Sequence, residues 1–301
     1  MLEFEKSDAT SQSADRPETL HGDISIDLTL LTATAQAAAR AAGGIQLDHF
    51  GKDGQRILDN LSHDLKIEMD CASEAAICHV IRGQYPEHAI VSEESGLMGP
   101  FADYTWIVDP LDGTLNYYFG LPFFCTSVAC YHTPRVSRPS GPSAHASTIV
   151  QGQPLVGVVF APYFDSLFSA TFGQGATCNG HPLCNERDVG LADAVVSVSY
   201  GSKESVIEQT EVIAAALLRR VKKIRMFGST ALELALLANG TISGLVRLDT
   251  DIWDFAAGRL ILAESGAGFK VWPNAVGGWQ ILAATPALYK PLMAIVESSL
   301  S

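Results

Sequence analysis

The sequence has few of the features that mark secreted or membrane-spanning proteins. Its six cysteines include no Cys-x-x-Cys pair. Neither a disulfide framework nor a structural zinc site is therefore indicated, and reduced thiols are expected. The N-terminus lacks the apolar core of a signal peptide, and no apolar run reaches the length of a membrane span. These absences predict a cytoplasmic protein with no membrane partner.

Positive charge is also scarce. Twenty Lys and Arg residues stand against thirty-three Asp and Glu residues, which gives a formal net charge of −13. An acidic balance of this size argues against a broad binding surface for a nucleic acid polymer, whose backbone is anionic. It is compatible with a small anionic substrate, because bound metal ions can invert the local sign of a site.

The chain of 301 residues is 47% hydrophobic, which suits one large globular protein of two closely packed lobes. Residues 1–23 are polar and acidic and are expected to form a flexible tail. We predict an N-terminal α+β lobe over residues 24–190 and a C-terminal α/β lobe over residues 191–301. The segment 133–153, rich in Pro, Ser and Gly, is interpreted as an insertion at the surface.

Apolar patterns predict helices and strands around several acidic residues. An alanine-rich helix is expected over residues 28–50, with a break at Gly43-Gly44. The short apolar runs before Glu93 and Asp109 are typical of strands that present acidic side chains at their ends.

The segment WIVDPLDGT combines carboxylates and turn-forming residues most densely. Asp109 is predicted to close a strand, and Pro110, which has no N–H, is predicted to take the chain out of the sheet. Asp112 follows three residues later, close enough to share a cation with Asp109. Gly113 permits a backbone conformation that other residues resist. Thr114 adds a hydroxyl group at a predicted helix start.

Three other segments combine carboxylates with chain turns, and they end at Asp70, Glu93-Glu94 and Asp254. Oxygen ligands of this kind suit Mg²⁺, whereas zinc normally takes His or Cys. Several carboxylates at one place repel one another unless cations neutralise them. If the four segments converge, the sequence therefore predicts a magnesium site. Taken singly, the SEES segment is typical of a solvated face and Asp70 of a helix N-cap.

The same motifs resemble those of the inositol monophosphatase family of Mg²⁺-dependent, lithium-sensitive phosphatases. The matching segments are WIVDPLDGTLNYYFGLPFF, WDFAAGRLILAESG, IVSEESG, GQGATCNGHPL and IRMFGSTALELALLANG. The resemblance runs from about residue 28 to near the C-terminus. It implies an α/β fold, a layered α-β-α-β-α sandwich of the inositol monophosphatase and fructose-bisphosphatase type with two sheet-bearing lobes. It also implies a homodimer, with the metals at the junction of the lobes.

The resemblance implies metal ligands residue by residue. Glu93, Asp109 and the main-chain carbonyl of Leu111 would hold a first Mg²⁺. Asp109, Asp112 and Asp254 would hold a second, and Glu93 would reach a third ion through water. Most of these ligands lie in the predicted N-terminal lobe.

The catalytic and substrate contacts are implied in the same way. Asp70 and Thr114, together with Glu93, would orient and activate the attacking water. The backbone amides of Gly113 and Thr114 would receive the phosphate. Further substrate or phosphate contacts are implied at Gly228, Ser229, Thr230 and Arg247. Lys66 and Glu68, just before Asp70, either form a solvent-exposed pair, which is the favoured interpretation, or alter the loop over the site.

Arg247 bears on the choice of substrate, because inositol-specific members carry a Glu seven residues before the position of Asp254. An arginine there either receives a second anionic group or forms an ion pair at a strand end, which is its commoner role. We expect hydrolysis of a small phosphomonoester by a metal-activated water. An inositol monophosphatase-like activity is the first hypothesis and a histidinol-phosphate phosphatase the main alternative, while a sugar bisphosphate and a phosphoadenosine phosphate also stay open as substrates. A non-catalytic regulatory scaffold that binds metal is the alternative, although such a protein would be expected to have lost a site residue.

Overall fold

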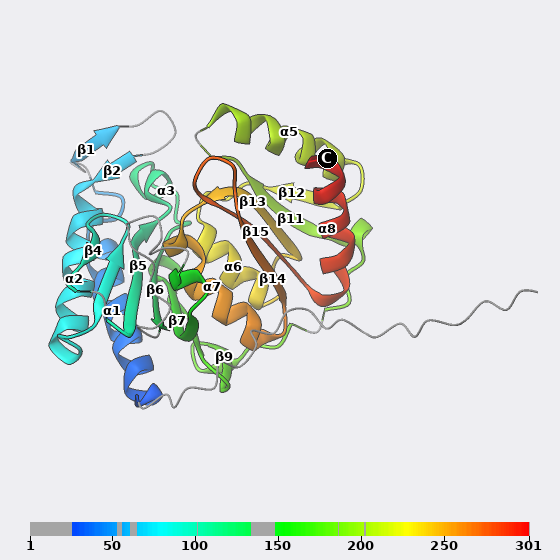
Figure 1. Ribbon diagram of the computed structural model, residues 1–301. Helices are drawn as coiled ribbons and strands as arrows, with labels where there is room; N and C mark the ends of the chain where they lie inside the picture. Colours follow the sequence, from blue (N-terminus) through cyan, green and yellow to red (C-terminus); the bar gives the residue numbers. More distant parts are fainter. Residues whose placement is uncertain are drawn as a thin grey trace, which may run out of the picture.

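Two β-sheets alternate with three layers of helices (Figure 1). This structure, a computed structural model, describes residues 26–52, 56–60, 65–100, 102–133, 148–185, 187–201 and 203–300. The predicted tail over residues 1–23 and most of the predicted insertion at 133–153 lie outside these ranges. The layer order is α-β-α-β-α, and the predicted fold class is confirmed.

The larger sheet has eight strands in the order β10-β9-β8-β7-β6-β5-β3-β4. They are β3 (Ala89–Ser92), β4 (Gly96–Met98), β5 (Tyr104–Asp112), β6 (Cys125–His132), β7 (Gln153–Ala161), β8 (Ser166–Thr171), β9 (Gly175–Cys178) and β10 (His181–Pro182). Strands β3 and β5 run parallel, so their carboxyl ends meet at one edge of the sheet. Glu93 follows β3 directly, and Asp109 lies near the end of β5.

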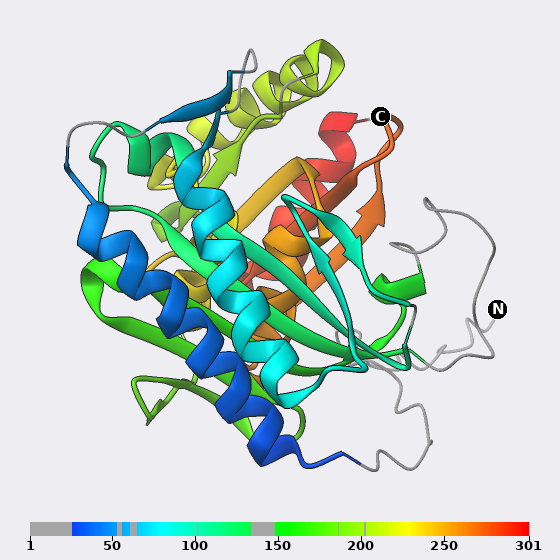
Figure 2. The same ribbon diagram turned by 90° about the vertical axis from the view of Figure 1, so that its left-hand side faces the viewer.

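Helices α1 (Leu28–His49) and α2 (Glu68–Gln84) lie side by side over the outer face of this sheet (Figure 2). A short ribbon of β1 (Ile57–Asn60) and β2 (Leu65–Ile67) connects them.

The predicted break of α1 at Gly43-Gly44 is wrong, because the helix continues to His49. A Cβ atom at Gly43 would lie 2.5 Å from the ring of Phe160 on β7. Gly43 therefore lets α1 approach the sheet closely.

The smaller sheet has five strands in the order β12-β11-β13-β15-β14. They are β11 (Val195–Ser199), β12 (Lys223–Arg225), β13 (Gly244–Thr250), β14 (Gly268–Pro273) and β15 (Trp279–Ala284). Helices α5 (Glu204–Leu218) and α8 (Pro286–Leu300) cover its outer face, while α6 (Thr230–Ala238) and α7 (Ile252–Ser265) fill the space between the sheets. The central apolar cluster joins both inner helices to both sheets. Among the described residues, no helix combines the length and apolar character needed to cross a bilayer.

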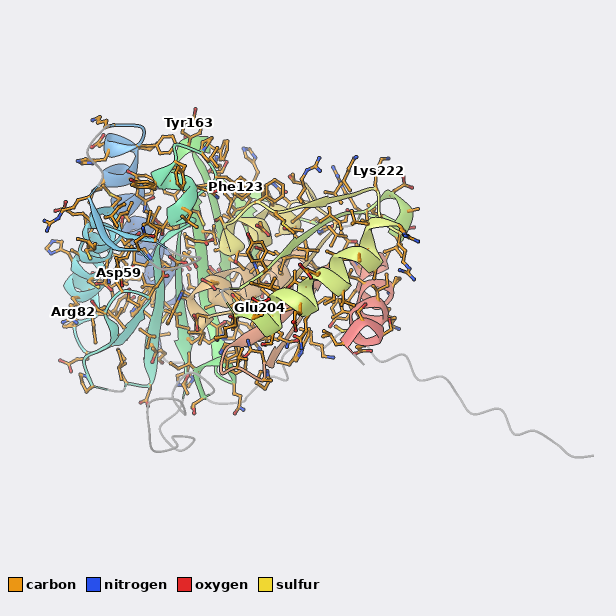
Figure 3. All side chains as sticks on the ribbon, turned by 90° about the horizontal axis from the view of Figure 1, so that it is seen from above. Asp59, Arg82, Phe123, Tyr163, Glu204 and Lys222 are labelled. Carbon is orange, nitrogen blue, oxygen red and sulfur yellow. The ribbon has the colours of Figure 1, made fainter. Side chains whose placement is uncertain are left out.

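Two loops beside the inner helices connect the half of the molecule that contains the larger sheet to the half that contains the smaller sheet. Phe123 follows α3 (Thr114–Tyr118), and its ring stacks on that of Phe227 with centroids 4.7 Å apart. Figure 3, viewed from above, shows Phe123 near the place where the two halves meet. The side-chain amide of Asn116 donates hydrogen bonds of 2.7 Å to the main-chain carbonyls of both phenylalanines. These contacts bring the end of β5 next to the start of α6.

Candidate metal centre

Three carboxylates meet where β5 approaches α7. Asp109 and Asp112 belong to β5, Asp254 lies in the first turn of α7, and one oxygen of each lies within 4.8 Å of the others. Asp109 is 1% exposed and Asp112 is 9% exposed. The carboxyl of Glu93, from the end of β3, is in hydrogen-bond contact with that of Asp109. Three of the four acidic segments therefore converge on this cluster.

A bulge in β5 places Asp109 and Asp112 together. Strand alternation alone would put side chains three residues apart on opposite faces of the sheet. On β6, however, Asp109 pairs with Ser127 and Asp112 with Cys125, so β5 has one extra residue between the two pairs. The prediction that the chain leaves the sheet at Pro110 is wrong, because β5 continues to Asp112. The extra residue therefore places both carboxylates on the same face of the sheet.

The start of α6 holds the carboxylate of Asp112. The Ser229 hydroxyl and the Ala231 N–H each donate a hydrogen bond of 2.7 Å to Asp112 Oδ2, and the Thr230 N–H donates one of 3.2 Å to Oδ1. A carboxylate at a helix N-terminus is also stabilised by the helix dipole. The Gly228 N–H donates to Glu233 Oε1 at 3.2 Å. Substrate contacts for Gly228, Ser229 and Thr230 stay predictions, since these polar groups contact protein carboxylates here.

Asp254 is fixed from its own turn. The Thr250 hydroxyl donates to Asp254 Oδ2 at 2.5 Å, and the Asp251 N–H donates to the same oxygen at 2.9 Å. Sequence reasoning missed Thr250, because a threonine in this acidic loop looks like an ordinary turn residue. Both contacts limit rotation of the Asp254 carboxylate.

Asp70 and Thr114 form the predicted pair next to the cluster. Thr114 Oγ1 lies 3.2 Å from Asp70 Oδ1 and 2.9 Å from the Leu111 carbonyl, and its single hydrogen can be donated to one of them at a time. Asp70 is not the N-cap of α2, which is Ile67. Its Oδ2 instead accepts the Ile67 N–H at 2.6 Å from the third helical position.

The cluster is electrostatically unfavourable without cations. Burial raises the pKa of Asp109 well above its usual range, and the charges of Glu93, Asp112 and Asp254 raise it further. Burial also raises the pKa of Asp112 to about 7, with Asp254 adding to the shift and the hydrogen bonds from α6 opposing it. The donors are carboxylate oxygens, the ligand type that hard divalent ions prefer. These residues therefore fit a magnesium site.

One cysteine also lies at the cluster. Cys125 Sγ is 3.6 Å from Asp112 Oδ2 and 3.7 Å from Ser229 Oγ. Burial raises the pKa of this thiol well above its usual range, and the charges of Asp112 and Asp109 raise it further. In the metal-free protein the thiol therefore stays protonated and can donate to Asp112.

Glu68 is exposed, as expected, but Lys66 pairs with a different residue than a solvent-exposed pair of the two would need. The Lys66 ammonium group forms an ion pair with Glu94, whose side chain is 8% exposed. The hydrogen bond to Glu94 raises the pKa of Lys66. The contact links β2 to the residue that follows Glu93, so it restrains the loop that carries Glu93.

Arg247 lies on β13 and forms a buried ion pair with Glu233 of α6. Its Nη2 is 3.5 Å from Glu233 Oε1, and the two side chains are 8% and 0% exposed. The Ser197 hydroxyl donates to Glu233 Oε2 at 2.6 Å. Within the part of the chain that the structure describes, Arg247 Nε and Nη2 have no hydrogen-bond acceptor. The charge of Arg247 is among the influences that lower the pKa of Asp112, which places the guanidinium group near the cluster.

Gly113→Ala is expected to lower the thermal midpoint of unfolding. Gly113 has φ +92°, and an added Cβ would meet the Phe123 carbonyl at 2.9 Å and Ser229 Cβ at 3.2 Å. The left-handed conformation alone costs a non-glycine residue about 1–2 kcal/mol. Gly120→Ala is the matched control, because Gly120 has φ +73° but open space around it. Equal losses in thermal unfolding for the two variants would contradict a steric role for Gly113.

Known proteins are similar to this chain in sequence and in fold. The model of the inositol monophosphatase family matches residues 27–137 and 146–299. The chain is 32% identical over 277 residues to Nus factor SuhB of Salmonella typhimurium, covering 90% of this chain and 97% of that relative. It is 30% identical over 266 residues to the fructose-1,6-bisphosphatase/inositol-1-monophosphatase of Aquifex aeolicus, covering 87% and 94%. The crystal structure of extragenic suppressor protein suhB from Bartonella henselae matches with a TM-score of 0.77 and 26% identity, covering 89% of this chain and 98% of that one.

Proposed function

The chain belongs to the inositol monophosphatase family, and we propose that it is a Mg²⁺-dependent phosphatase that hydrolyses a small phosphomonoester to an alcohol and inorganic phosphate. The convergence of Asp109, Asp112 and Asp254 within 4.8 Å carries this proposal. A buried carboxylate cluster of this kind needs divalent cations to be stable in its ionised form.

Two or three Mg²⁺ ions would be held by the residues of this cluster. Glu93, Asp109 and the Leu111 carbonyl would hold the first, and Asp109, Asp112 and Asp254 the second. Glu93 would reach a third ion through water. When bound, such ions lower the pKa of water and neutralise the charge of the phosphoryl oxygens.

The side chains of Asp70 and Thr114 would position the attacking water. With the Thr114 hydroxyl donating to Asp70 Oδ1, its oxygen can accept a hydrogen bond from the water. The water oxygen forms a bond to phosphorus as the bond to the alcohol oxygen breaks. The proton released from the water moves toward Asp70, and the alcohol oxygen takes up a proton from solvent. The N–H groups of Gly113 and Thr114 would donate to the phosphate.

The names of the relatives indicate two different classes of function. The Salmonella typhimurium relative is named a Nus factor, and the Aquifex aeolicus relative is named as a phosphatase. For this chain, the presence of every proposed ligand favours catalysis over a non-catalytic metal-binding scaffold. The net charge of −13 argues against a nucleic acid partner. We further propose a cytoplasmic homodimer that lithium inhibits.

A panel of phosphorylated metabolites separates these classes. The panel contains inositol 1-phosphate, histidinol phosphate, fructose 1,6-bisphosphate and 3′-phosphoadenosine 5′-phosphate, each assayed with Mg²⁺ in the presence and absence of Li⁺. Phosphate release from at least one compound, reduced by Li⁺, is the expected result. No release from any of them by a protein that binds divalent metal would favour the scaffold.

A substrate with a second anionic group is a candidate within this function. It is favoured by Arg247, which is 7% exposed and whose Nε and Nη2 have no acceptor among the described residues. A carboxylate or phosphate of the substrate would satisfy both nitrogens, because the guanidinium fork matches such groups. Because Nη2 carries two hydrogens, it would keep its ion pair with Glu233 and share the substrate anion with Nε.

The double variant Glu233→Gln/Arg247→Gln tests this specificity. Removing Arg247 alone would leave Glu233 buried without its cation, which costs about 3–5 kcal/mol. The double variant removes both charges together. If Arg247 binds a second anion, kcat/KM for a bisphosphate should fall about tenfold, equivalent to one charge-assisted hydrogen bond. The value for a monophosphate of a neutral polyol should change less than twofold. Equal changes for the two substrates would contradict a specificity role.

A further inference from the structure

Gln46 lies on α1, behind the carboxylate cluster, and its side chain is fully buried. Its Nε2 is 2.8 Å from the Pro110 carbonyl, 3.0 Å from Thr126 Oγ1 and 3.1 Å from Ser73 Oγ. Its main-chain carbonyl accepts a hydrogen bond of 2.9 Å from the Tyr117 hydroxyl. One residue thus contacts α2, the bulge of β5, β6 and α3, and each of these elements borders the proposed site.

The peptide between Pro110 and Leu111 connects Gln46 to the cluster. In a trans peptide the C=O and the next N–H point in opposite directions. The Pro110 carbonyl points toward Gln46 and Thr126, whose hydroxyl also donates to it at 3.1 Å. The Leu111 N–H therefore points the other way, where it donates to Asp109 Oδ1 at 3.1 Å. Gln46 therefore binds the carbonyl group of a peptide whose N–H group orients the carboxylate of Asp109.

The bulge explains why this carbonyl depends on side-chain donors. Between the pairs Asp109–Ser127 and Asp112–Cys125, the regular ladder of β5 and β6 is interrupted. The Pro110 carbonyl is buried there, and a buried carbonyl without a donor costs about 1–3 kcal/mol. Gln46 gives it the shortest of its two side-chain hydrogen bonds. Loss of Gln46 would allow the peptide plane to rotate toward other donors, and the Leu111 N–H would rotate with it.

We propose that Gln46 is a positioning residue for the divalent-metal site, acting through the Pro110–Leu111 peptide on the carboxylate of Asp109. The inference rests on the proposed function, in which Asp109 is shared by two ions and the Leu111 carbonyl is itself a ligand. Gln46 touches neither metal nor substrate. Changes at residues that orient metal ligands typically reduce metal affinity about 10–100-fold.

The test compares Gln46→Met with Gln153→Met in direct binding of Mn²⁺ alone, measured by calorimetry on metal-free protein without substrate. Gln153 is also buried and its Nε2 also donates to a proline carbonyl, that of Pro154. It pairs with His132 at the end of β6, whereas Asp112 pairs with Cys125 at the start of β6. The Kd for Mn²⁺ should rise about tenfold or more in Gln46→Met and less than twofold in Gln153→Met. A purely structural role would lower the thermal midpoint of both variants and leave both Kd values unchanged.

A Kd within twofold of wild type in Gln46→Met would overturn the proposal. If that variant does not fold, Thr126→Val decides, because it removes the other donor to the same carbonyl. A rise in Kd of about threefold is expected for it, and an unchanged Kd contradicts the proposal. Because no substrate is present, the test is independent of turnover. Wild-type protein that binds Mn²⁺ but releases no phosphate would refute the phosphatase and leave the role of Gln46 standing, whereas wild type that binds no Mn²⁺ would overturn both.

Discussion

Asp112→Asn is expected to lower kcat for phosphomonoester hydrolysis about 1,000-fold, because loss of a metal-ligand charge removes several kcal/mol of transition-state stabilisation. The amide has the size of the carboxylate, keeps one oxygen for the two 2.7 Å hydrogen bonds from Ser229 and Ala231, and loses only the 3.2 Å hydrogen bond from the Thr230 N–H, so the start of α6 should stay in place. The measurement is the rate of phosphate release at saturating substrate over a range of Mg²⁺ concentrations.

Asp193→Asn serves as the matched control. Its side chain is 76% exposed and pairs with Lys222 at the surface, so the same chemical change there should alter kcat less than twofold. If Asp112→Asn kept more than a tenth of the wild-type kcat, Asp112 would not be a ligand of the catalytic metal.

The metal-free protein should lose stability as the pH rises from about 4 to about 7. Burial raises the pKa of Asp112 from 3.8 to about 7, and that of Asp109 also lies well above 3.8. In this window the folded state keeps protons that the unfolded state has released, so the free energy of unfolding falls with rising pH. For Asp112 alone the loss is at most about 4 kcal/mol. Mg²⁺ replaces the protons and should restore the stability, by about 2.7 kcal/mol at one hundred times its Kd.

His88 contributes a slope of the opposite sign, which the experiment must remove. Burial lowers the pKa of His88 to about 4, so its contribution to stability is lost as the pH falls from about 6.5 to about 4. Its Nδ1 accepts the Trp106 indole N–H at 3.1 Å, and His88 precedes β3 whereas Glu93 follows the other end of this strand, so we expect His88 to affect metal-free and Mg²⁺-loaded protein equally. The difference between the two unfolding free energies cancels it. This difference, from denaturant titrations, should grow between about pH 4.5 and 7.5, and a constant difference would contradict a carboxylate site.

Strand and turn patterns predicted the separate acidic segments, whereas the resemblance to the family predicted the fold class and the convergence of these segments. Strands followed by acidic residues predicted β3 and β5, and their parallel pairing brings Glu93 and Asp109 to one edge. Asp254 was also identified as a carboxylate at a chain turn, but only the resemblance to the family predicted that it joins Asp109 and Asp112, which lie far away in the chain. The pairing of Asp70 with Thr114 was predicted in the same way, and the structure contains it.

Contacts between distant residues could not be predicted. Gly43 looked like a helix break, but its role depends on the Phe160 ring of another element. The bulge at Pro110 depends on donors from α1 and β6 that no local pattern indicates. Gln46 looks like a surface residue of an alanine-rich helix, and only its burial reveals its contacts. The division into lobes over residues 24–190 and 191–301 stays a prediction.

Titration of metal-free protein with Mg²⁺ tests the metal-dependent phosphatase most directly. Protein is first treated with EDTA and passed through a desalting column, and phosphate release from the best substrate of the panel is then followed as Mg²⁺ is added. We expect no release above background at zero Mg²⁺, and a rate that rises and saturates as the ion is added. Turnover by the EDTA-treated wild-type protein at the Mg²⁺-saturated rate would contradict a metal site built from Asp109, Asp112 and Asp254.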